Sequence, residues 1–340
     1  MDKNTQIECY IQSHIGGRNE NQDSAGYLEA PIGAVVVVCD GMGALNGGST
    51  ASRIAVKTII DEVADADADA VPADVLKSAI LHANDAIMDA AEEDPDLLGM
   101  GTTVTAIIIN DDCATVSYLG DSRVYQLRGR NKVFRTFDHS FVFQSVKVGL
   151  ITEEQARLSS QSNVITKALG IKREVEVDVY ELPYLSGDRF VLCTDGFWGA
   201  MPETELISLI SKGNVSTVLE KATLQIDLTG IRRGGHHDNL TAAMFEVTKD
   251  SIRKTKMNTK IKLLIASLAL ALVMSLSFNV YQCINCSETQ SAIGVPAETA
   301  TSDDGEQTNN KQQETDERNT ASEQSDSENV DDDSYSEDDK

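Results

Sequence analysis

Two apolar runs in this chain end in the same way, with an aspartate followed by a glycine. The first is Val35-Val36-Val37-Val38-Cys39-Asp40-Gly41, and the second is Arg189-Phe190-Val191-Leu192-Cys193-Thr194-Asp195-Gly196. Each run is typical of a buried β-strand that ends in a sharp turn. An unpaired carboxylate is costly to remove from water, so buried strands need a reason to end in Asp40 and Asp195. We expect these two side chains to share a bound cation.

The pattern of apolar residues predicts one compact domain over residues 1–248. Many β-branched runs follow one another, and helix-like patterns are set apart from them, which is typical of an α+β fold with antiparallel sheets covered by helices. The predicted strands are 33–39, 103–109, 114–119, 122–127, 175–181, 188–194 and 240–247, and the predicted helices are 49–64, 73–93, 203–212 and 216–228. A mixed, polar segment at 139–163 is expected to form a small surface insertion.

Negative charge is concentrated at the C-terminal end of the sequence. The formal net charge is −25, and residues 287–340 hold 17 Asp and Glu against 3 Lys and Arg, a net charge of −14. Because it has almost no apolar residues to bury, the acidic segment 283–340 is predicted to be disordered. The preceding residues carry a mildly acidic balance of −11 and lack the clustered Lys and Arg of a nucleic-acid-binding surface.

An uncharged apolar segment precedes the acidic tail. Residues 263–281 contain no charge, Pro or Gly, and as a helix they would span about 28 Å, close to the hydrocarbon thickness of a bilayer. Six basic residues lie in the juxtamembrane linker 249–262. A buried core helix is the alternative, but these flanks favour one transmembrane helix at 263–282, with the domain cytoplasmic and the tail outside the cell membrane. Cys283 and Cys286 have no second Cys or His pair nearby, so no zinc site is expected there.

Candidate cation ligands occur at five places along the domain. They are Asp23, Asp40, Asp121, Asp195 and Asp238. Carboxylates without paired His or Cys suit Mg²⁺ or Mn²⁺ rather than Zn²⁺, and two such ions about 3.5–4 Å apart can activate a water molecule for attack on phosphorus. Arg18 offers a planar guanidinium that can bind a phosphoryl group with two hydrogen bonds. Each motif alone is more often a simple turn, but together they indicate phosphate-ester hydrolysis.

The order of the motifs resembles that of the bacterial members of the protein phosphatase 2C family, which are metal-dependent protein phosphatases. The resemblance covers nearly all of residues 5–247. Its motifs are Arg18 with Asn21-Gln22-Asp23, Asp40-Gly41-Met42-Gly43 with Gly48, Gly101-Thr102-Thr103, Gly120-Asp121-Ser122-Arg123-Val124-Tyr125, Asp138-His139-Ser140, Val148-Gly149-Leu150-Ile151-Thr152, Ile165-Thr166-Lys167-Ala168-Leu169-Gly170, Asp195-Gly196 and Asp238-Asn239. The resemblance implies a β-sandwich of two antiparallel sheets flanked by helices, with a metal-binding cleft at one edge.

The resemblance also implies a metal-binding role for several residues. Asp40 would bridge two Mn²⁺ or Mg²⁺ ions, and the carbonyl of Gly41 would join the second ion. Asp195 and Asp238 would complete the first ion's ligands. Asp121 matches the position that helps to bind a third, weaker metal ion in bacterial members.

The remaining implied roles concern the substrate, the water and the leaving group. Asp23 would hold metal-bound water, and Arg18 would bind the substrate phosphate. Gly199 stands where many members have an Asp, so one ligand of the third metal ion would be absent here. Met42 stands where eukaryotic members carry a His proposed as the general acid, so the leaving group must be protonated by water or by another group.

The resemblance implies a serine/threonine phosphoprotein phosphatase in which a water that bridges two Mn²⁺ or Mg²⁺ ions attacks phosphoserine or phosphothreonine. Its partners would be phosphorylated proteins, among them a cognate Ser/Thr kinase that it opposes at the membrane. A pseudophosphatase, which would bind phosphoproteins without hydrolysing them, is the alternative. The intact metal-binding aspartates and Arg18 favour the enzyme. The sequence does not distinguish a broad phosphatase from one dedicated to a single regulatory substrate.

Overall fold

The computed structural model describes residues 7–44, 47–251, 267 and 270–278. The chain divides into two compact units, Met1–Asn258 and Thr259–Lys340. The strands of the first unit are β1 (Tyr10–His14), β2 (Asp23–Ala30), β3 (Gly33–Met42), β4 (Gly101–Thr102), β5 (Val104–Ile109), β6 (Ala114–Leu119), β7 (Arg123–Arg128), β8 (Asn131–Arg135), β9 (Asp178–Leu182), β10 (Asp188–Cys193) and β11 (Leu240–Glu246). Its helices are α1 (Gly47–Ala64), α2 (Pro72–Glu93), the 3₁₀ turn η1 (Pro95–Leu97), α3 (Phe141–Lys147), α4 (Glu153–Arg157), α5 (Asp195–Trp198), α6 (Glu203–Ile210) and α7 (Val215–Arg232).

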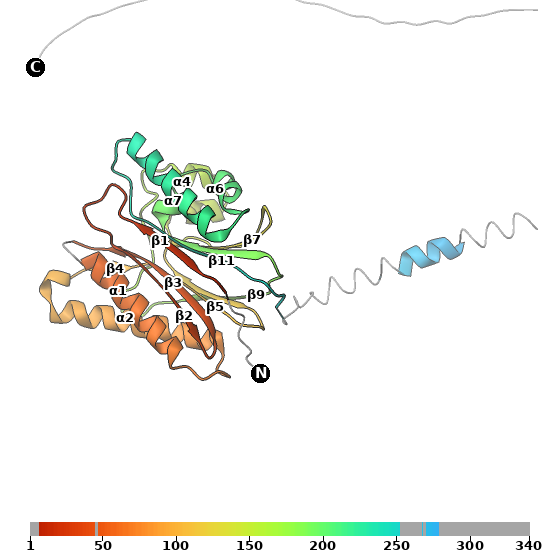
Figure 1. The fold of residues 1–340 in the computed structure, drawn as a ribbon, viewed down its shortest axis with the longest axis horizontal. Coiled ribbons are helices and arrows are strands. Elements are labelled where there is room, and N and C mark those ends of the chain that lie inside the picture. Colours follow the sequence, from red (N-terminus) through yellow and green to blue (C-terminus); the bar gives the residue numbers. More distant parts are fainter. Residues whose placement is uncertain (1–6, 45–46, 252–266, 268–269, 279–340) are drawn as a thin grey trace, which may run out of the picture. The chain divides into compact units, whose positions relative to one another are not determined.

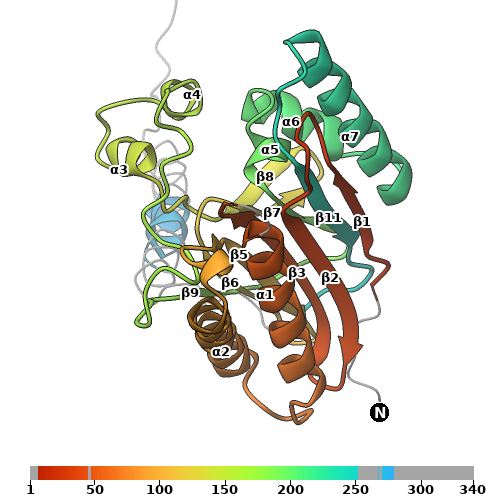
Figure 2. The ribbon, with the colours of Figure 1, turned by 90° about the vertical axis from the view of Figure 1, so that its left-hand side faces the viewer.

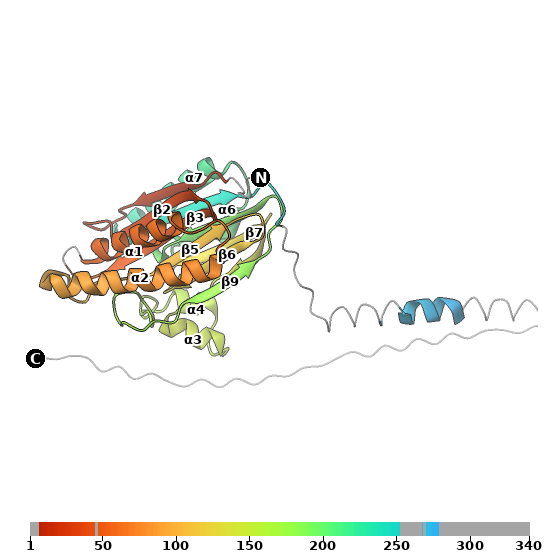
Figure 3. The same cartoon turned by 90° about the horizontal axis from the view of Figure 1, so that it is seen from below.

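Two antiparallel sheets form the centre of the first unit, as far as it is described. One sheet has the strand order β1-β11-β10-β7-β8, and the other has the order β2-β3-β5-β6-β9, with the short β4 paired to β3. Helices α1 and α2 pack together over the second sheet, and α7 packs on β1 and β11 of the first (Figures 1 and 3). Figure 2 shows α3 and α4 in a lobe to one side of the sandwich. The predicted α+β sandwich flanked by helices is therefore confirmed.

Strand β3 is buried on both of its faces. Val35, Val37 and Cys39 belong to the core between the second sheet and helices α1 and α2. Val36 and Val38 belong to the core between the two sheets. Successive side chains of a strand point to opposite faces, so a strand in the middle of a layered fold needs apolar residues at every position. The unbroken run of valines in the sequence has this cause.

Strand β10 repeats this arrangement in the first sheet. Val191 and Cys193 pack toward the helices that cover that sheet, whereas Phe190 and Leu192 pack between the sheets. Both runs singled out in the sequence are thus central strands of the sandwich.

Only residues 267 and 270–278 of the second unit are described. Residues 270–278 are helical and expose the apolar side chains of Leu270, Leu272, Val273, Met274, Leu276 and Phe278. Among the described residues, no helix combines the length and the apolar character that crossing a membrane requires. The predicted transmembrane segment 263–282 is described only in part, and residues 252–262 and 283–340 of the predicted linker and tail lie outside the described residues.

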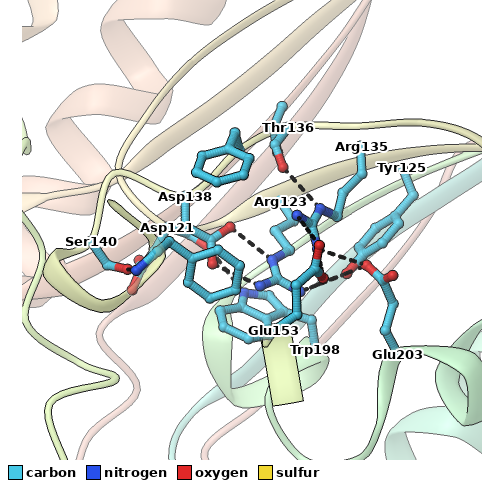
Figure 4. A network of polar contacts seen from close by, with 12 residues as sticks. Asp121, Arg123, Tyr125, Arg135, Thr136, Asp138, Ser140, Glu153, Trp198 and Glu203 are labelled. Carbon is cyan, nitrogen blue, oxygen red and sulfur yellow. Dashed lines mark hydrogen bonds and ion pairs between the residues drawn. The ribbon is translucent and has the colours of Figure 1, made fainter. Parts of the chain in front are cut away.

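A buried arginine joins the first sheet to the lobe that carries α3 and α4. The Arg123 side chain, 3% exposed, donates two hydrogen bonds to Asp138, from Nε to Oδ1 at 2.8 Å and from Nη2 to Oδ2 at 2.7 Å (Figure 4). Its Nη1 donates to the hydroxyl of Tyr125 at 3.1 Å. The guanidinium carbon lies 3.4 Å from the centre of the Trp198 ring and 4.9 Å from that of Phe143, so the cation also interacts with two aromatic faces.

Stability should depend strongly on this buried pair. Removing one partner of a buried ion pair leaves the other charge without compensation and costs about 3–5 kcal/mol. We therefore expect Arg123→Met to lower the free energy of unfolding by about that amount, measured by urea denaturation with far-ultraviolet circular dichroism. Arg130→Met, at an exposed position in the β7–β8 turn, should change it by less than about 0.5 kcal/mol. An effect of Arg123→Met as small as that of Arg130→Met would contradict the assignment.

Candidate functional site

Asp23 and Asp40 lie opposite one another where strands β2 and β3 pair at one end of the second sheet. The antiparallel register places Asp23 directly across from Asp40. Burial raises the pKa of Asp23 to about 7, and the nearby charges of Asp195 and Asp238 add to this increase. Burial followed by the charge of Asp23 raises the pKa of Asp40 well above its usual range. Two carboxylates held together in this way favour either a shared proton or a cation.

Asp195 reaches the same region from the other sheet, as the first residue of α5 after strand β10. The hydroxyl of its neighbour Thr194 donates to Asp23 Oδ2 at 3.0 Å. Burial, followed by the charge of Asp238, raises the pKa of Asp195 to about 6. Its Oδ1 is buried and has no hydrogen-bond partner among the described residues. A buried carboxylate oxygen without a donor is a strong candidate for a cation ligand, because such groups are otherwise hydrogen-bonded.

Asp238 lies just before β11 and is brought close to Asp195 by a glycine. A Cβ atom on Gly196 would lie 2.0 Å from the carbonyl oxygen of Asn239 and 3.1 Å from the Cβ of Asp238. No side chain fits in that space, so Gly196 permits the close approach of the two segments. Asp238 Oδ2 accepts a hydrogen bond from Arg18 Nη2 at 2.8 Å, with the Arg18 side chain 51% exposed.

Gly41 occupies a place that a larger residue could not. A Cβ there would lie 2.1 Å from the carbonyl oxygen of Gly48 and 2.5 Å from that of Gln22. The close packing of backbone around Gly41 fixes the chain directly after Asp40, where the sequence predicts a carbonyl ligand.

Asp121 lies beside the other carboxylates, in the turn between β6 and β7. It is 4% exposed, and burial, then the charges of Asp195 and Asp138, raise its pKa well above the usual range. Its backbone carbonyl accepts a hydrogen bond from Trp198 Nε1 at 3.0 Å, and Trp198 in turn stacks on Arg123 (Figure 4). The buried arginine therefore supports the position of Asp121. Gly199 contributes no side-chain ligand, so the structure adds no support for the predicted third ion.

Two threonines fix the backbone of Asp40, a role that the sequence did not predict. The amide of Thr103 donates to the carbonyl of Asp40 at 2.8 Å, and the amide of Asp40 donates to Thr103 Oγ1 at 2.9 Å. Thr102 Oγ1 donates to the same carbonyl at 2.8 Å. The motif Gly101-Thr102-Thr103 was visible in the sequence, but its function was not.

Asn239 connects the segments that carry Arg18, Asp23 and Asp238. Its Nδ2 donates to the carbonyls of Ile15 at 2.8 Å and Glu20 at 2.9 Å, and its Oδ1 accepts from the amide of Gln22 at 2.9 Å. One side chain thus ties the loop before β2 to the start of β11. The motif Asp238-Asn239 is the only signal in the sequence, and it did not reveal these partners.

The histidines near the site have different surroundings. His139 accepts a hydrogen bond at Nδ1 from the amide of Gly120 at 3.2 Å, and its Nε2 lies 2.7 Å from Asp178 Oδ2. Burial lowers the pKa of His139. These contacts make His139 a structural support for the turn before Asp121. His237 Nε2 lies 2.9 Å from Asp227 Oδ1, so this side chain points to α7.

A cavity of about 390 Å³ adjoins Asp195 and Asp238. Arg18 and Trp198 also contribute to its wall. Its volume falls within the range of sites that bind small molecules or side chains. In the described part of the chain, no three His, Cys, Asp or Glu side chains are already arranged to hold a metal ion. Asp23, Asp40 and Asp195 nevertheless fit a cation, because burial and mutual repulsion disfavour their ionisation without one.

The chain is similar to bacterial proteins that are named as phosphatases over this domain. It is 34% identical to the serine/threonine phosphatase stp of Listeria monocytogenes over 235 residues, which cover 67% of this chain and 91% of the relative. It is also 34% identical to the serine/threonine protein phosphatase PstP of Mycobacterium tuberculosis over 233 residues, covering 68% of this chain and 43% of that protein.

Solved structures have the same fold. The catalytic domain of PstP in complex with two manganese ions aligns with a TM-score of 0.60 and 29% identity, covering 72% of this chain and 99% of that one. The serine/threonine phosphatase Stp1 from Staphylococcus aureus aligns with a TM-score of 0.64 and 26% identity, covering 73% of this chain and 97% of that one. The family described as protein phosphatase 2C matches residues 12–230. Since this match spans well over half of the sequence and its relatives share the sandwich, the chain belongs to the protein phosphatase 2C family.

Proposed function

We propose that this chain hydrolyses phosphoserine and phosphothreonine in proteins, with two bound Mn²⁺ or Mg²⁺ ions. Family membership and the similarity to named phosphatases confirm the predicted class of enzyme, a protein serine/threonine phosphatase. The observation that carries the metal-dependent mechanism is the gathering of buried carboxylates from both sheets, with one Asp195 oxygen that has no donor among the described residues. The PstP catalytic domain with two manganese ions supports the same stoichiometry.

The carboxylates of Asp40, Asp195 and Asp238 and the carbonyl of Gly41 are the groups that would hold the two ions. Oxygen ligands of this kind match the preference of Mg²⁺ and Mn²⁺. When bound, the ions supply Lewis acidity that activates water and neutralises charge on the phosphoryl group. Asp23, aligned opposite Asp40 and held by Thr194, would orient the attacking water.

Arg18 is the group that would bind the phosphoryl oxygens. Its guanidinium is half exposed, lines the cavity and is held toward the carboxylates by Asp238. Since Asp238 occupies Nη2, the other guanidinium nitrogens can donate to a phosphoryl group. The alternative of a pseudophosphatase receives no support from the site, because each of the predicted carboxylates is present and close to the others.

We further propose a membrane-bound enzyme that opposes a Ser/Thr kinase. The apolar run 263–281, its basic flank and the acidic tail support a single-pass protein with the catalytic domain in the cytoplasm and the tail outside. The exposed apolar side chains of residues 270–278 are consistent with a lipid environment. We also propose a third, weaker metal ion at Asp121, where a group other than residue 199 supplies the ligand that Gly199 lacks.

Turnover should require a divalent cation and the carboxylates that would bind it. Replacing a direct ligand should cost at least the 10–100-fold known for groups that only support ligands, so we expect Asp40→Asn to lower kcat by more than about 100-fold. The assay is Mn²⁺-dependent release of phosphate from a phosphoserine peptide, with Asp67→Asn, at an exposed loop position, as the matched control. Undiminished turnover in excess chelator would refute the two-metal mechanism.

Arg18→Ala should mainly raise KM. The guanidinium binds phosphate in the ground state and in the transition state alike, and losing such uniform binding raises KM without changing kcat. Loss of charge-assisted hydrogen bonds predicts an increase of about tenfold or more. Arg130 is exposed in the β7–β8 turn and does not line the cavity, so Arg130→Ala should leave kcat and KM unchanged. If kcat collapses at constant KM, Arg18 instead serves to position Asp238.

The proposed topology predicts which part of the chain an external protease can reach. Protease added to intact cells should remove the acidic segment 283–340 and leave the domain before residue 249 intact, as followed by antibodies to each end. Cleavage of the domain with protection of the tail, or recovery of the full-length protein in the soluble fraction, would rule out the proposed orientation.

A further inference from the structure

The cavity next to Asp195 and Asp238 extends to two arginines from separate helices. Arg157 is the last residue of α4, and Arg233 directly follows α7. Both line the same cavity as Arg18. Neither arginine has a role in the proposed metal site, so we looked for another role for them in this wall.

Both arginines are anchored to one turn of the backbone. Arg157 Nη1 donates to the carbonyl of Gly199 at 2.9 Å, and Arg233 Nη1 donates to the carbonyl of Ala200 at 3.2 Å. Consecutive Cα atoms are about 3.8 Å apart, so the two guanidiniums are anchored to adjacent residues of the cavity wall. This turn directly follows α5, whose first residue is Asp195.

The two arginines differ in their ion pairs. Arg157 donates to Glu154 from Nε at 2.9 Å and from Nη2 at 2.6 Å, which accounts for one carboxylate. Arg233 forms no ion pair with any residue in the described ranges, and its residue is exposed. Arg18 is already paired with Asp238. Among the three arginines of this wall, Arg233 is thus the one without a carboxylate partner in the described ranges, and the exposed His236 lines the same cavity.

We propose that Arg157 and Arg233 form a second anion subsite that binds an acidic group of the substrate near the phosphoserine or phosphothreonine. The proposal rests on the proposed function, since it makes the cavity the place where the phosphoprotein segment lies. Arg157 is fixed by its bonds to Gly199 and Glu154, which use three of its five N–H groups. Arg233 donates only to Ala200 and keeps the rest of its N–H groups for a ligand. A planar fork of this kind matches phosphate and carboxylate oxygens. The favoured substrates are thus segments with a second phosphoryl or carboxylate group close to the scissile one.

Peptide binding to the full-length protein in detergent can be measured by the fluorescence of Trp198. This residue is the only tryptophan of the chain and lines the cavity. Three peptides of equal length would be titrated into the protein in the presence of chelator to give their dissociation constants. Their KM values would be measured in the presence of Mn²⁺. The first has one phosphoserine, the second adds another phosphoserine within four residues, and the third has Asp at that added position. We expect the doubly phosphorylated peptide to bind about tenfold more tightly than the singly phosphorylated one, with the Asp peptide in between.

The matched variants are Arg233→Ala and Arg232→Ala. Arg232 is exposed at the end of the same helix and does not line the cavity. Arg233→Ala should abolish the preference for the second anion, Arg233→Lys should restore part of it, and Arg232→Ala should keep it. Circular dichroism of each variant checks that it is folded.

The outcomes separate this proposal from the proposed function. The subsite would be overturned by equal dissociation constants for the three peptides. It would also be overturned if Arg233→Ala and Arg232→Ala lost the preference for the second anion to the same extent. Either result would count even if the singly phosphorylated peptide is turned over in Mn²⁺. A preference that depends on Arg233 would support the subsite even if no peptide is hydrolysed. If the doubly phosphorylated peptide binds no more tightly than the Asp peptide, the subsite would be assigned to carboxylate groups.

Discussion

The burial of several neighbouring carboxylates is the constraint on which the rest of this site depends. Asp23, Asp40 and Asp195 come from three elements and two sheets, and each has a raised pKa because burial and its neighbours disfavour ionisation. A raised pKa in the folded state contributes stability below the unfolded pKa, and that contribution is lost as the pH rises through the folded value. For Asp23 and Asp195 the loss falls between about 4 and 7. At neutral pH a bound cation is therefore the natural way to offset the charge.

The sandwich holds these charges in place through its backbone and its buried polar groups. Thr102 and Thr103 fix the segment around Asp40, and Asn239 ties together the loops before β2 and β11. On the other side, Arg123 supports Trp198, whose indole binds the carbonyl of Asp121 (Figure 4). Because each support is itself buried and hydrogen-bonded, the carboxylates cannot simply move apart.

Strands β3 and β10 could be predicted because burial on both faces leaves an unbroken apolar run, and their terminal aspartates revealed the site. Strands β1, β2 and β8 were missed. Tyr10–His14 and Asp23–Ala30 are only partly buried and Asn131–Arg135 is largely exposed, so none of them carries a strong apolar pattern. The short helices α3 and α4 were likewise seen only as a polar insertion.

Pairings between distant residues could not be predicted from the sequence. Arg18 and Asp238 lie 220 residues apart, and Asn239 binds residues at the opposite end of the domain. Such contacts follow from the pairing of β1 with β11, and a local pattern of apolar residues does not reveal which distant strands pair. The same holds for Arg157 and Arg233, which line one cavity because both bind the turn after α5.

The most direct test of the central claim is the unfolding temperature of the full-length protein and of Asp195→Asn, each in excess chelator and in Mn²⁺. Asp195 Oδ1 has no hydrogen-bond donor among the described residues, so an amide in its place removes charge without removing a known bond at that atom. We predict that Asp195→Asn unfolds at a higher temperature than the wild type in chelator, and that Mn²⁺ raises the unfolding temperature of the wild type far more than that of the variant. A variant that is less stable in chelator and gains as much from Mn²⁺ would contradict the carboxylate site.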